Sequence, residues 1–325
     1  MTQLDRRISA APMMDYTDRH CRYLMRLVSP AVLLYTEMVT AQALKHGHVD
    51  HLLAFDASEH PVALQLGGSD PELLAWAARL GAEYGYDEIN LNVGCPSDRV
   101  QNGNFGACLM ADPQIVADCV SAMREAVSVP VTVKCRIGID ELDDYGFFHH
   151  FVSVVREAGV NVFVVHARKA ILQGLTPKEN REIPPLRYEV PWRLKQEHPD
   201  LTVVLNGGLK TIAQVREWLP RFDGVMLGRQ AYSEPYLLAQ LHGELVDTEW
   251  TPPSRDEIVE KYADYTERML AEGHRLPSLL RHLHGLYAGF PGARSWRRYL
   301  GEQGVRPGAD ADVLRASLRI LRDAA

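Results

Sequence analysis

The chain has 325 residues, of which 46% are hydrophobic and 24% charged, as is typical of a globular protein with one large and one small domain. Its net charge of −7 disfavours a nucleic-acid partner at first sight. Its five cysteines include no CxxC pair, which argues against disulfides and a structural zinc site and predicts a reducing, cytoplasmic environment. Neither an apolar leader nor a run of 18 apolar residues occurs, so we expect no membrane partner.

Eight short apolar segments alternate with helical segments along roughly the first 230 residues. Eight strands alternating with helices over such a length predict a closed (β/α)8 TIM barrel. A doubly wound open sheet is the alternative, but the first segment ends in AAPMMD and lacks the GxGxxG motif common in that fold. The expected strands span residues 8–14, 33–38, 62–68, 88–94, 131–138, 162–167, 202–208 and 224–229.

The fourth expected strand ends abruptly at a cysteine. Apolar residues alternate with Asn90 and Asn92 until Gly94, Cys95 and Pro96 end the strand. Cys95 therefore lies at the carboxyl end of a strand, at the start of a glycine-rich loop. A buried, inert thiol is one interpretation, but the polar neighbours favour a thiol available for chemistry.

Polar residues and glycines gather at the carboxyl ends of the expected strands, which converge on one face of a barrel and form its site. The glycines after strands seven and eight, with Arg229, predict a phosphate-binding site. Lys134 lies within an apolar strand, so it needs an electron-rich ligand such as a flavin or a phosphate, or else forms a Schiff base. Besides Cys95, the strand-end residues are Pro12, Met13, Glu37, Met38, Gln65, Asn92, Lys134, Arg136, His166, Arg168, Asn206, Gly207, Gly208, Gly228 and Arg229.

One connection is too long to serve only as a link between strand and helix. Residues 167–191 are rich in charge and proline without a clear period, and loops of this length in compact domains are usually functional. His149 and His150 are adjacent and would face apart on a helix, so we expect no metal site.

The segment Trp250 to Pro253 is a stiff break that predicts a domain boundary, with a barrel over 1–245 and a helical bundle over 250–325. Ser254 and Glu257 predict a capping box for the first bundle helix. Residues 251–325 contain 12 Lys and Arg against 10 Asp and Glu, and the stretch 275–298 has five arginines and no acid. This local charge could attract a polyanion in spite of the overall sign.

Several motifs together resemble the flavin-dependent tRNA dihydrouridine synthases over essentially the whole chain. They are GCPSDRVQNGNFGACLM, APMMDYTDRHCR, VKCRIG, VVHAR and LNGG. The segments HARKAILQGLTPKENREIPPL and PGARSWRRYL are similar to the A-type branch, the tRNA-dihydrouridine(20/20a) synthases. The resemblance implies an FMN-binding barrel followed by a helical domain that helps to hold tRNA, with no obligate protein partner evident.

The resemblance also implies roles for individual residues. Cys95 matches the catalytic thiol, and Asn92 matches a contact to the target nucleotide. The implied FMN-binding residues are Pro12, Met13, Met14, Gln65, Lys134, His166, Asn206, Gly207, Gly208, Gly228 and Arg229. The implied tRNA-binding residues are Lys178, Asn180, Arg181, Arg294, Arg297 and Arg298.

The chemistry expected from this resemblance is reduction of the C5=C6 bond of D-loop uridines 20 and 20a, with NADPH as a transient reductant. A hydride from flavin N5 adds at C6, and the Cys95 thiol supplies a proton to C5. An ordinary thiol is mostly protonated at neutral pH, so this acid role requires no special activation. The base must leave the tRNA fold to reach the flavin, which explains a second, basic contact to the phosphates.

Two alternatives remain open from the sequence. One is a flavin barrel that acts on a small molecule, similar to a dihydroorotate dehydrogenase or nitronate oxidase, although such a substrate has no use for the arginines of 275–298. The other is a barrel that binds RNA without catalysis. Replacement of Cys95 separates catalysis from binding.

Overall fold

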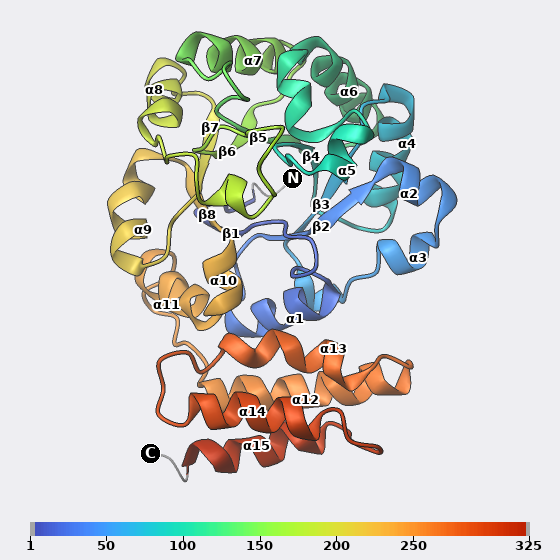
Figure 1. The fold of residues 1–325 in the computed structure, drawn as a ribbon, viewed down its shortest axis with the longest axis vertical. Coiled ribbons are helices and arrows are strands. Elements are labelled where there is room, and N and C mark those ends of the chain that lie inside the picture. Colours follow the sequence, from blue (N-terminus) through green and yellow to red (C-terminus); the bar gives the residue numbers. More distant parts are fainter. Residues whose placement is uncertain (1–3, 323–325) are drawn as a thin grey trace.

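The computed structural model describes residues 4–322, apart from the side chain of Arg99; residues 1–3 and 323–325, which belong to the two expected domain spans, lie outside the described residues. Eight parallel strands pair in the order β1-β8-β7-β6-β5-β4-β3-β2 (Figure 1). Ala10 donates to the Leu33 carbonyl at 3.0 Å, and Leu33 donates to the Ile8 carbonyl at 3.1 Å, so the chain before β2 returns to β1. The expected TIM barrel is therefore confirmed, and the open-sheet alternative is wrong.

The strands lie where the apolar segments predicted them, with differences at their ends. β1 stops four residues earlier than expected because Pro12 has no N–H to continue a strand, and the Thr17 side chain then accepts from the Met13 N–H at 2.9 Å. Pro12, Met13 and Met14 consequently lie in a loop. The strands are β1 Ile8–Ala10, β2 Leu34–Thr40, β3 Val62–Gly67, β4 Glu88–Val93, β5 Val131–Arg136, β6 Val162–His166, β7 Thr202–Asn206 and β8 Gly224–Leu227.

Helices surround the strands and then form the carboxyl-terminal bundle. The predicted capping box of Ser254 and Glu257 is confirmed at the start of α12, and the side chains of Asp70 and Thr211 cap α4 and α9. None of the described helices is long and apolar enough to span a bilayer. The helices are α1 Arg19–Val28, α2 Ala41–His46, α3 Val49–Leu52, α4 Pro71–Glu83, α5 Asp98–Asn102, α6 Pro113–Ala126, α7 Tyr145–Glu157, α8 Glu189–Glu197, α9 Ile212–Trp218, α10 Arg229–Ser233, α11 Tyr236–Leu245, α12 Arg255–Ala271, α13 Leu276–Leu280, α14 Ala293–Gln303 and α15 Asp312–Arg322.

Two apolar clusters fill the molecule. The larger lies between the strands and the surrounding helices and continues into the bundle. The smaller lies inside the barrel and contains Tyr35, Val164 and Met226 among its members. It stays small because β4 contributes Glu88, Asn90 and Asn92 to the buried interior instead of the branched apolar residues common in such barrels.

The bundle packs beside the barrel through aromatic side chains of α12, which contacts α1 (Figure 1). Tyr265 stacks on Tyr23 of α1 with 3.8 Å between ring centroids, and its hydroxyl lies 2.7 Å from Nδ1 of His20. Tyr262 is fully buried in the same contact. Burial of such large side chains couples the position of the bundle to that of α1.

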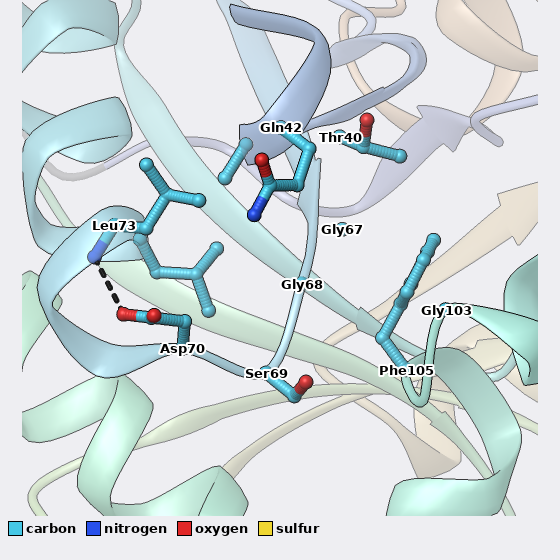
Figure 2. Close-up of a pocket in the computed structure, with 11 residues that line it drawn as sticks. Thr40, Gln42, Gly67, Gly68, Ser69, Asp70, Leu73, Gly103 and Phe105 are labelled. Atoms are coloured by element: carbon cyan, nitrogen blue, oxygen red, sulfur yellow. Dashed lines mark hydrogen bonds between the residues drawn. The ribbon is translucent and has the colours of Figure 1, made fainter. Parts of the chain in front are cut away.

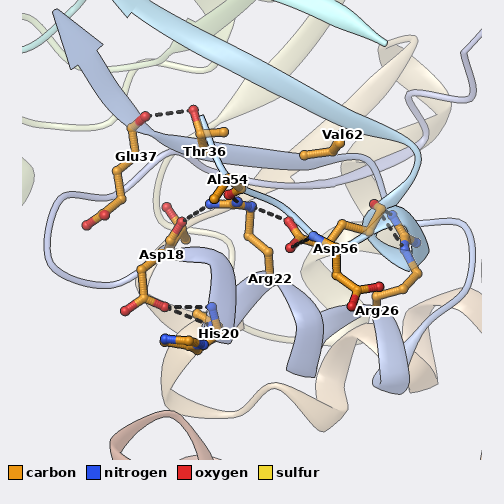
Figure 3. Close-up of polar contacts among 12 residues, drawn as sticks. Asp18, His20, Arg22, Arg26, Thr36, Glu37, Ala54, Asp56 and Val62 are labelled. Carbon is orange, nitrogen blue, oxygen red and sulfur yellow. Dashed lines mark hydrogen bonds and ion pairs between the residues drawn. The ribbon is translucent and has the colours of Figure 1, made fainter. Parts of the chain in front are cut away.

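A charged contact adds to this interface. Asp18 caps α1 by accepting from the backbone N–H of His20 and Cys21 (Figure 3). The same carboxylate lies 2.6 Å from an Arg281 nitrogen and 3.0 Å from Nε2 of His282, both in the bundle. Burial alone raises the pKa of Asp18, but the hydrogen bonds and charges of His282 and Arg281 outweigh burial and hold that pKa well below the usual range.

We predict that Asp18→Asn lowers the free energy of unfolding by about 1–3 kcal/mol at pH 7, because asparagine keeps the helix cap and loses the ion pair. Folding lowers the pKa of Asp18. The contribution of its carboxylate to the free energy of unfolding is therefore present above about pH 4 and is lost as the pH falls further. Urea unfolding from pH 3 to 7 measures this difference. Asp70→Asn, which changes a cap without a bundle partner, is the control and should cost only a few tenths of a kcal/mol.

Candidate active site

Cys95 lies at the carboxyl end of β4, as predicted. Its backbone N–H donates to Asn92 Oδ1 at 3.0 Å, and its carbonyl accepts from the Ala107 N–H at 2.9 Å. The half-buried thiol donates to the Ser97 hydroxyl at 3.5 Å. The inert, fully buried environment instead belongs to Cys21, Cys119 and Cys135.

Gly106 allows the loop after Cys95 to fold back on that residue. Its φ of +79° is in the left-handed region, and a Cβ at this position would lie 2.6 Å from the Cys95 carbonyl oxygen. The close approach leaves room only for glycine, so the loop and the thiol are held together by backbone geometry.

The expected strand-end residues of β4 to β7 come together at the same edge of the barrel. Asn92 is paired with Lys134 across β4 and β5, and His166 is paired with Asn206 across β6 and β7. Lys134 Nζ donates to Asn206 Oδ1 at 3.1 Å across the barrel interior. Positions up to 72 residues apart in the chain thus meet in direct contact.

Positive charge is concentrated at this edge. Burial, followed by repulsion from Arg136, lowers the pKa of Lys134 to about 8, and burial likewise lowers that of Arg136 to about 10. Burial and the charges of Arg136 and Lys134 hold the pKa of His166 well below its ordinary value, so that ring is neutral at pH 7. Within residues 4–322, neither Lys134 nor Arg136 has a carboxylate partner. Such a site favours an anionic ligand.

The glycines after β7 and β8 differ in the space around their backbone: the side chains of His166 and Leu186 crowd Gly207 and Gly208, whereas Gly228 is open. Gly207 and Gly208 have φ of +122° and +70°, and a Cβ on Gly207 would lie 2.8 Å from the His166 ring. At Gly228 the nearest atoms to such a Cβ are 3.8 Å away. Arg168 Nε is buried and has no hydrogen-bond partner among the described residues. Free N–H groups beside small residues fit a phosphate.

The long loop between β6 and α8 closes over the same edge. Arg136 donates to the carbonyl of Asn180 at 3.0 Å, and Arg229 forms an ion pair with Glu182 at 2.5 Å. Arg168 donates to the carbonyls of Glu182 and Pro184. Arg229, expected to hold a phosphate, is therefore engaged by the loop in this structure.

The residues expected to bind tRNA differ in accessibility. Lys178 and Arg181 are exposed on the loop, and Arg294, Arg297 and Arg298 are exposed on α14. Asn180 is fully buried; its side chain accepts from the Ile171 N–H at 2.7 Å and donates to the Ile171 carbonyl at 2.8 Å. Its expected contact with tRNA stays a prediction, but the structure shows Asn180 folding the loop rather than facing outward.

Asn92 and Gln65 are also occupied by protein contacts. Gln65 is fully buried and bonds through both ends of its amide, to Asn90 at 2.8 Å and to Asn92 at 2.8 Å. Met14, in contrast, is 50% exposed in the β1 loop. The expected cofactor residues thus range from the barrel interior to the surface of its mouth.

A cavity of about 260 Å³ lies at the carboxyl ends of β2 and β3, beside the start of α4 (Figure 2). Thr40, Gln42, Ser69 and Leu73 line it, and Phe105 from the Cys95 loop covers one side. None of the expected cofactor residues lines this cavity, so it is separate from the basic edge described above.

A histidine contact was not predicted from the sequence. His149 meets His198, with 3.0 Å between their Nε2 atoms, and Glu197 is 4.0 Å from His149 Nε2. Arg156 donates to His198 Nδ1 at 2.8 Å, which leaves the proton of His198 on Nε2. A protonated nitrogen cannot ligate a metal, so the spacing of this group alone does not make a metal site.

We predict that Lys134→Met raises the free energy of unfolding of the protein without bound ligand by about 1–3 kcal/mol at pH 7, because an unpaired buried charge is removed. The native lysine loses its proton near pH 8, whereas the unfolded one keeps it until about pH 10.5. The gain in free energy of unfolding from Lys134→Met should therefore decline as the pH rises from about 8 to about 10.5. Denaturant titrations at several pH values measure it.

Lys195→Met is the matched control for this prediction. Lys195 lies 2.7 Å from Asp223 and also donates to two carbonyls, so its removal should lower the stability. A loss of stability for Lys134→Met similar to that of the control would contradict the unpaired charge at Lys134.

Comparison with known proteins identifies the family of this chain. A family model described as dihydrouridine synthase matches residues 9–320. The chain is 55% identical to a tRNA-dihydrouridine(20/20a) synthase of Vibrio vulnificus (strain CMCP6), over 96% of both chains. Proteins of the same name from Salmonella typhi and Escherichia coli O6:H1 are each 54% identical, over 98% of this chain and 96% of theirs. The chain therefore belongs to the dihydrouridine synthase family and is an enzyme of that family.

Proposed function

We propose that this enzyme reduces the C5=C6 bond of uridines 20 and 20a in the D-loop of tRNA, with bound FMN as cofactor and NADPH as reductant. The relatives that carry this specificity in their names match nearly the whole chain. The observation that carries the proposal is that the Cys95 thiol and an uncompensated basic edge share one end of one barrel. Reduction of uracil needs a proton donor and a hydride donor: the thiol can supply the proton, and the basic edge can hold an anionic flavin that supplies the hydride.

The residues of the basic edge fit FMN. The open backbone at Gly228, with the unpartnered Nε of Arg168, suits its phosphate, and Gly207 and Gly208 follow the neighbouring strand. Lys134, His166, Asn206 and Gln65 are the residues that would hold the ring system, and Pro12, Met13 and Met14 lie in the loop after β1. Arg229 would contribute if its ion pair with Glu182 opens. When bound, the flavin supplies the hydride for C6 of the uracil.

Cys95 supplies the other hydrogen. The S–H bond of Cys95 breaks as its proton moves to C5, and C6 receives the hydride. Together these steps add the equivalent of one H₂ across the C5=C6 bond. Arg136 and Arg181 are the cations near the thiolate that remains, and a proton from solvent then restores the thiol. The hydrogen bond from Cys95 N–H to Asn92 holds the acid in place during this transfer.

Substrate binding is assigned to two exposed basic segments. Lys178 and Arg181 lie on the loop over the site, where they would contact the nucleotides next to the reacting base. The bundle, residues 250–325, would hold phosphates elsewhere on the tRNA through Arg294, Arg297 and Arg298. Two separated contacts to the backbone favour the extruded state of the target base over its place in the tRNA fold.

We predict that Cys95→Ala lowers the rate of dihydrouridine formation on unmodified tRNA by about 10²–10⁴-fold, the usual contribution of a general acid. The variant should still bind tRNA and flavin, which gives the purified protein a yellow colour. Mapping dihydrouridine in the treated tRNA by mass spectrometry measures the rate and the positions. Cys108→Ala is the matched control, since that thiol is half-buried in the same segment and should be dispensable. Activity of the Cys95 variant at the parent rate would contradict the assigned acid, and product at other positions would contradict the assigned specificity.

We also predict that Arg294→Glu and Arg297→Glu weaken tRNA binding and lower the slope of log affinity against log salt by roughly one for each phosphate contact removed. Arg319→Glu, the same charge reversal on an exposed residue of α15, is the control. Binding measured by filter retention at several salt concentrations gives the slopes. Equal slopes for all three variants would show that α14 makes no specific phosphate contact.

A further inference from the structure

A continuous chain of buried side-chain hydrogen bonds runs through the barrel to the backbone of Cys95. We call it the polar column, and it consists of Glu88, Thr132, Asn90, Gln65 and Asn92. Its internal donor-acceptor distances are 2.6 Å from Thr132 to Glu88 and 2.8 Å for each of the other three bonds. Each of these side chains is at most 8% exposed.

The column begins at a carboxylate whose own position is fixed. Arg6 lies 2.5 Å from Glu88 Oε2, and the hydroxyl of Tyr35 donates to Glu88 Oε1 at 2.8 Å. Burial raises the pKa of Tyr35 well above its ordinary value, so this hydroxyl stays a donor. Glu88 is at the first position of β4, so it lies at the end of the barrel opposite Cys95.

An ionised carboxylate only accepts hydrogen bonds, and this gives the column a direction. Thr132 must donate to Glu88, so its oxygen is left to accept from the Asn90 amide nitrogen. The oxygen of Asn90 then accepts from Gln65, and the oxygen of Gln65 accepts from Asn92. The oxygen of Asn92 is left for the N–H groups of Gly94 and Cys95, at 3.1 and 3.0 Å.

We propose that Glu88 is a positioning residue: through the polar column, its charge at one end of the barrel orients the Asn92 amide so that its oxygen holds the backbone of Cys95 at the other end. The functional meaning of this inference rests on the proposed role of Cys95, but the column itself does not. An amide turned the other way would face these N–H groups with its own NH₂ and release the loop.

A charge-swap cycle tests the coupling between the two ends. Glu88→Gln puts Arg6, which only donates, in competition with Thr132 for one amide oxygen. Asn92→Asp replaces the amide that donates to the Gln65 oxygen by a carboxylate, so two hydrogen-bond acceptors face each other. The double variant Glu88→Gln/Asn92→Asp restores a consistent column with every bond reversed and still offers an acceptor to Cys95.

The expected result is strong non-additivity in stability. The unfolding equilibrium constant of the double variant should be about tenfold smaller than the product of the two single effects predicts, as for residues in one hydrogen-bond network. Denaturant titrations of the full chain measure it, and they require neither FMN nor tRNA. Additive effects would overturn the proposal.

Repulsion between two carboxylates in the Asn92→Asp variant could also give non-additivity, and one variant separates the two causes. Thr132→Val interrupts the column between its ends and leaves both charges in place. In this background the coupling should fall to less than about twofold, because its path is broken. A coupling that persists there comes from direct repulsion and contradicts the column.

The consequence for Cys95 is measured separately. In Glu88→Gln, alkylation of Cys95 by iodoacetamide, followed by mass spectrometry, should be about fivefold faster or more, because a released loop exposes the thiol. If the proposed reaction is correct, kcat should fall about tenfold with little change in KM for tRNA, since the acid is misplaced and the binding surface is intact.

Tyr35→Phe is the matched control, because it removes a hydrogen bond to the same carboxylate from outside the path to Cys95. It should lower stability to a similar degree while alkylation and kcat stay within about twofold of the parent. Equal effects of both variants on the thiol would show a merely structural role for Glu88. If the Glu88 and Asn92 variants are non-additive as expected but Cys95→Ala keeps full activity, the polar column is supported and only the proposed function is contradicted.

Discussion

The parallel register of β4 to β7 is the constraint on which the rest of this site depends. Because neighbouring strands run in one direction without a shift, Asn92 lies beside Lys134, Arg136 beside His166, and His166 beside Asn206. A slip of one residue in any pair would turn one of these side chains toward the helices. The contact between Lys134 and Asn206 shows that the register brings the polar groups together inside the barrel.

The electrostatics of the site follow from the lack of carboxylate partners for Lys134 and Arg136 among the described residues. Lysine and arginine side chains are enclosed at the barrel mouth, and the carbonyl groups that Arg136 contacts neutralise none of that charge. The protein thereby carries a cost in its ligand-free state that an anionic cofactor can relieve. Arg136, Arg168 and Arg229 also contact the loop of residues 167–191, so the basic edge and this loop share one set of cations.

The bundle is attached by contacts of a different kind. Stacked tyrosines and a shared carboxylate join α12 and the segment after α13 to α1. These contacts between buried aromatic and charged side chains favour a fixed position of the bundle relative to the barrel.

The sequence by itself determined the secondary structure, because its signals are local. Short apolar segments located each strand, the capping box of Ser254 and Glu257 located the start of α12, and Gly94 with Pro96 marked the strand end at Cys95. The long loop and the basic bundle segment were also visible, since composition alone reveals them. The end of β1 was predicted too late because an apolar run continues past Pro12, where strand pairing cannot.

Tertiary structure alone decided which groups meet and which face they take. In β4 both sets of alternating residues are buried, so the pattern could not show that Glu88, Asn90 and Asn92 face the barrel interior and Ile89 and Leu91 the helices. The burial of Asn180 and the ion pair of Arg229 likewise depend on where a 25-residue loop folds back. Hydrogen bonds between residues 25 to 44 positions apart, as in the polar column, leave no periodic trace in the chain, because the partner of each group is chosen by strand pairing.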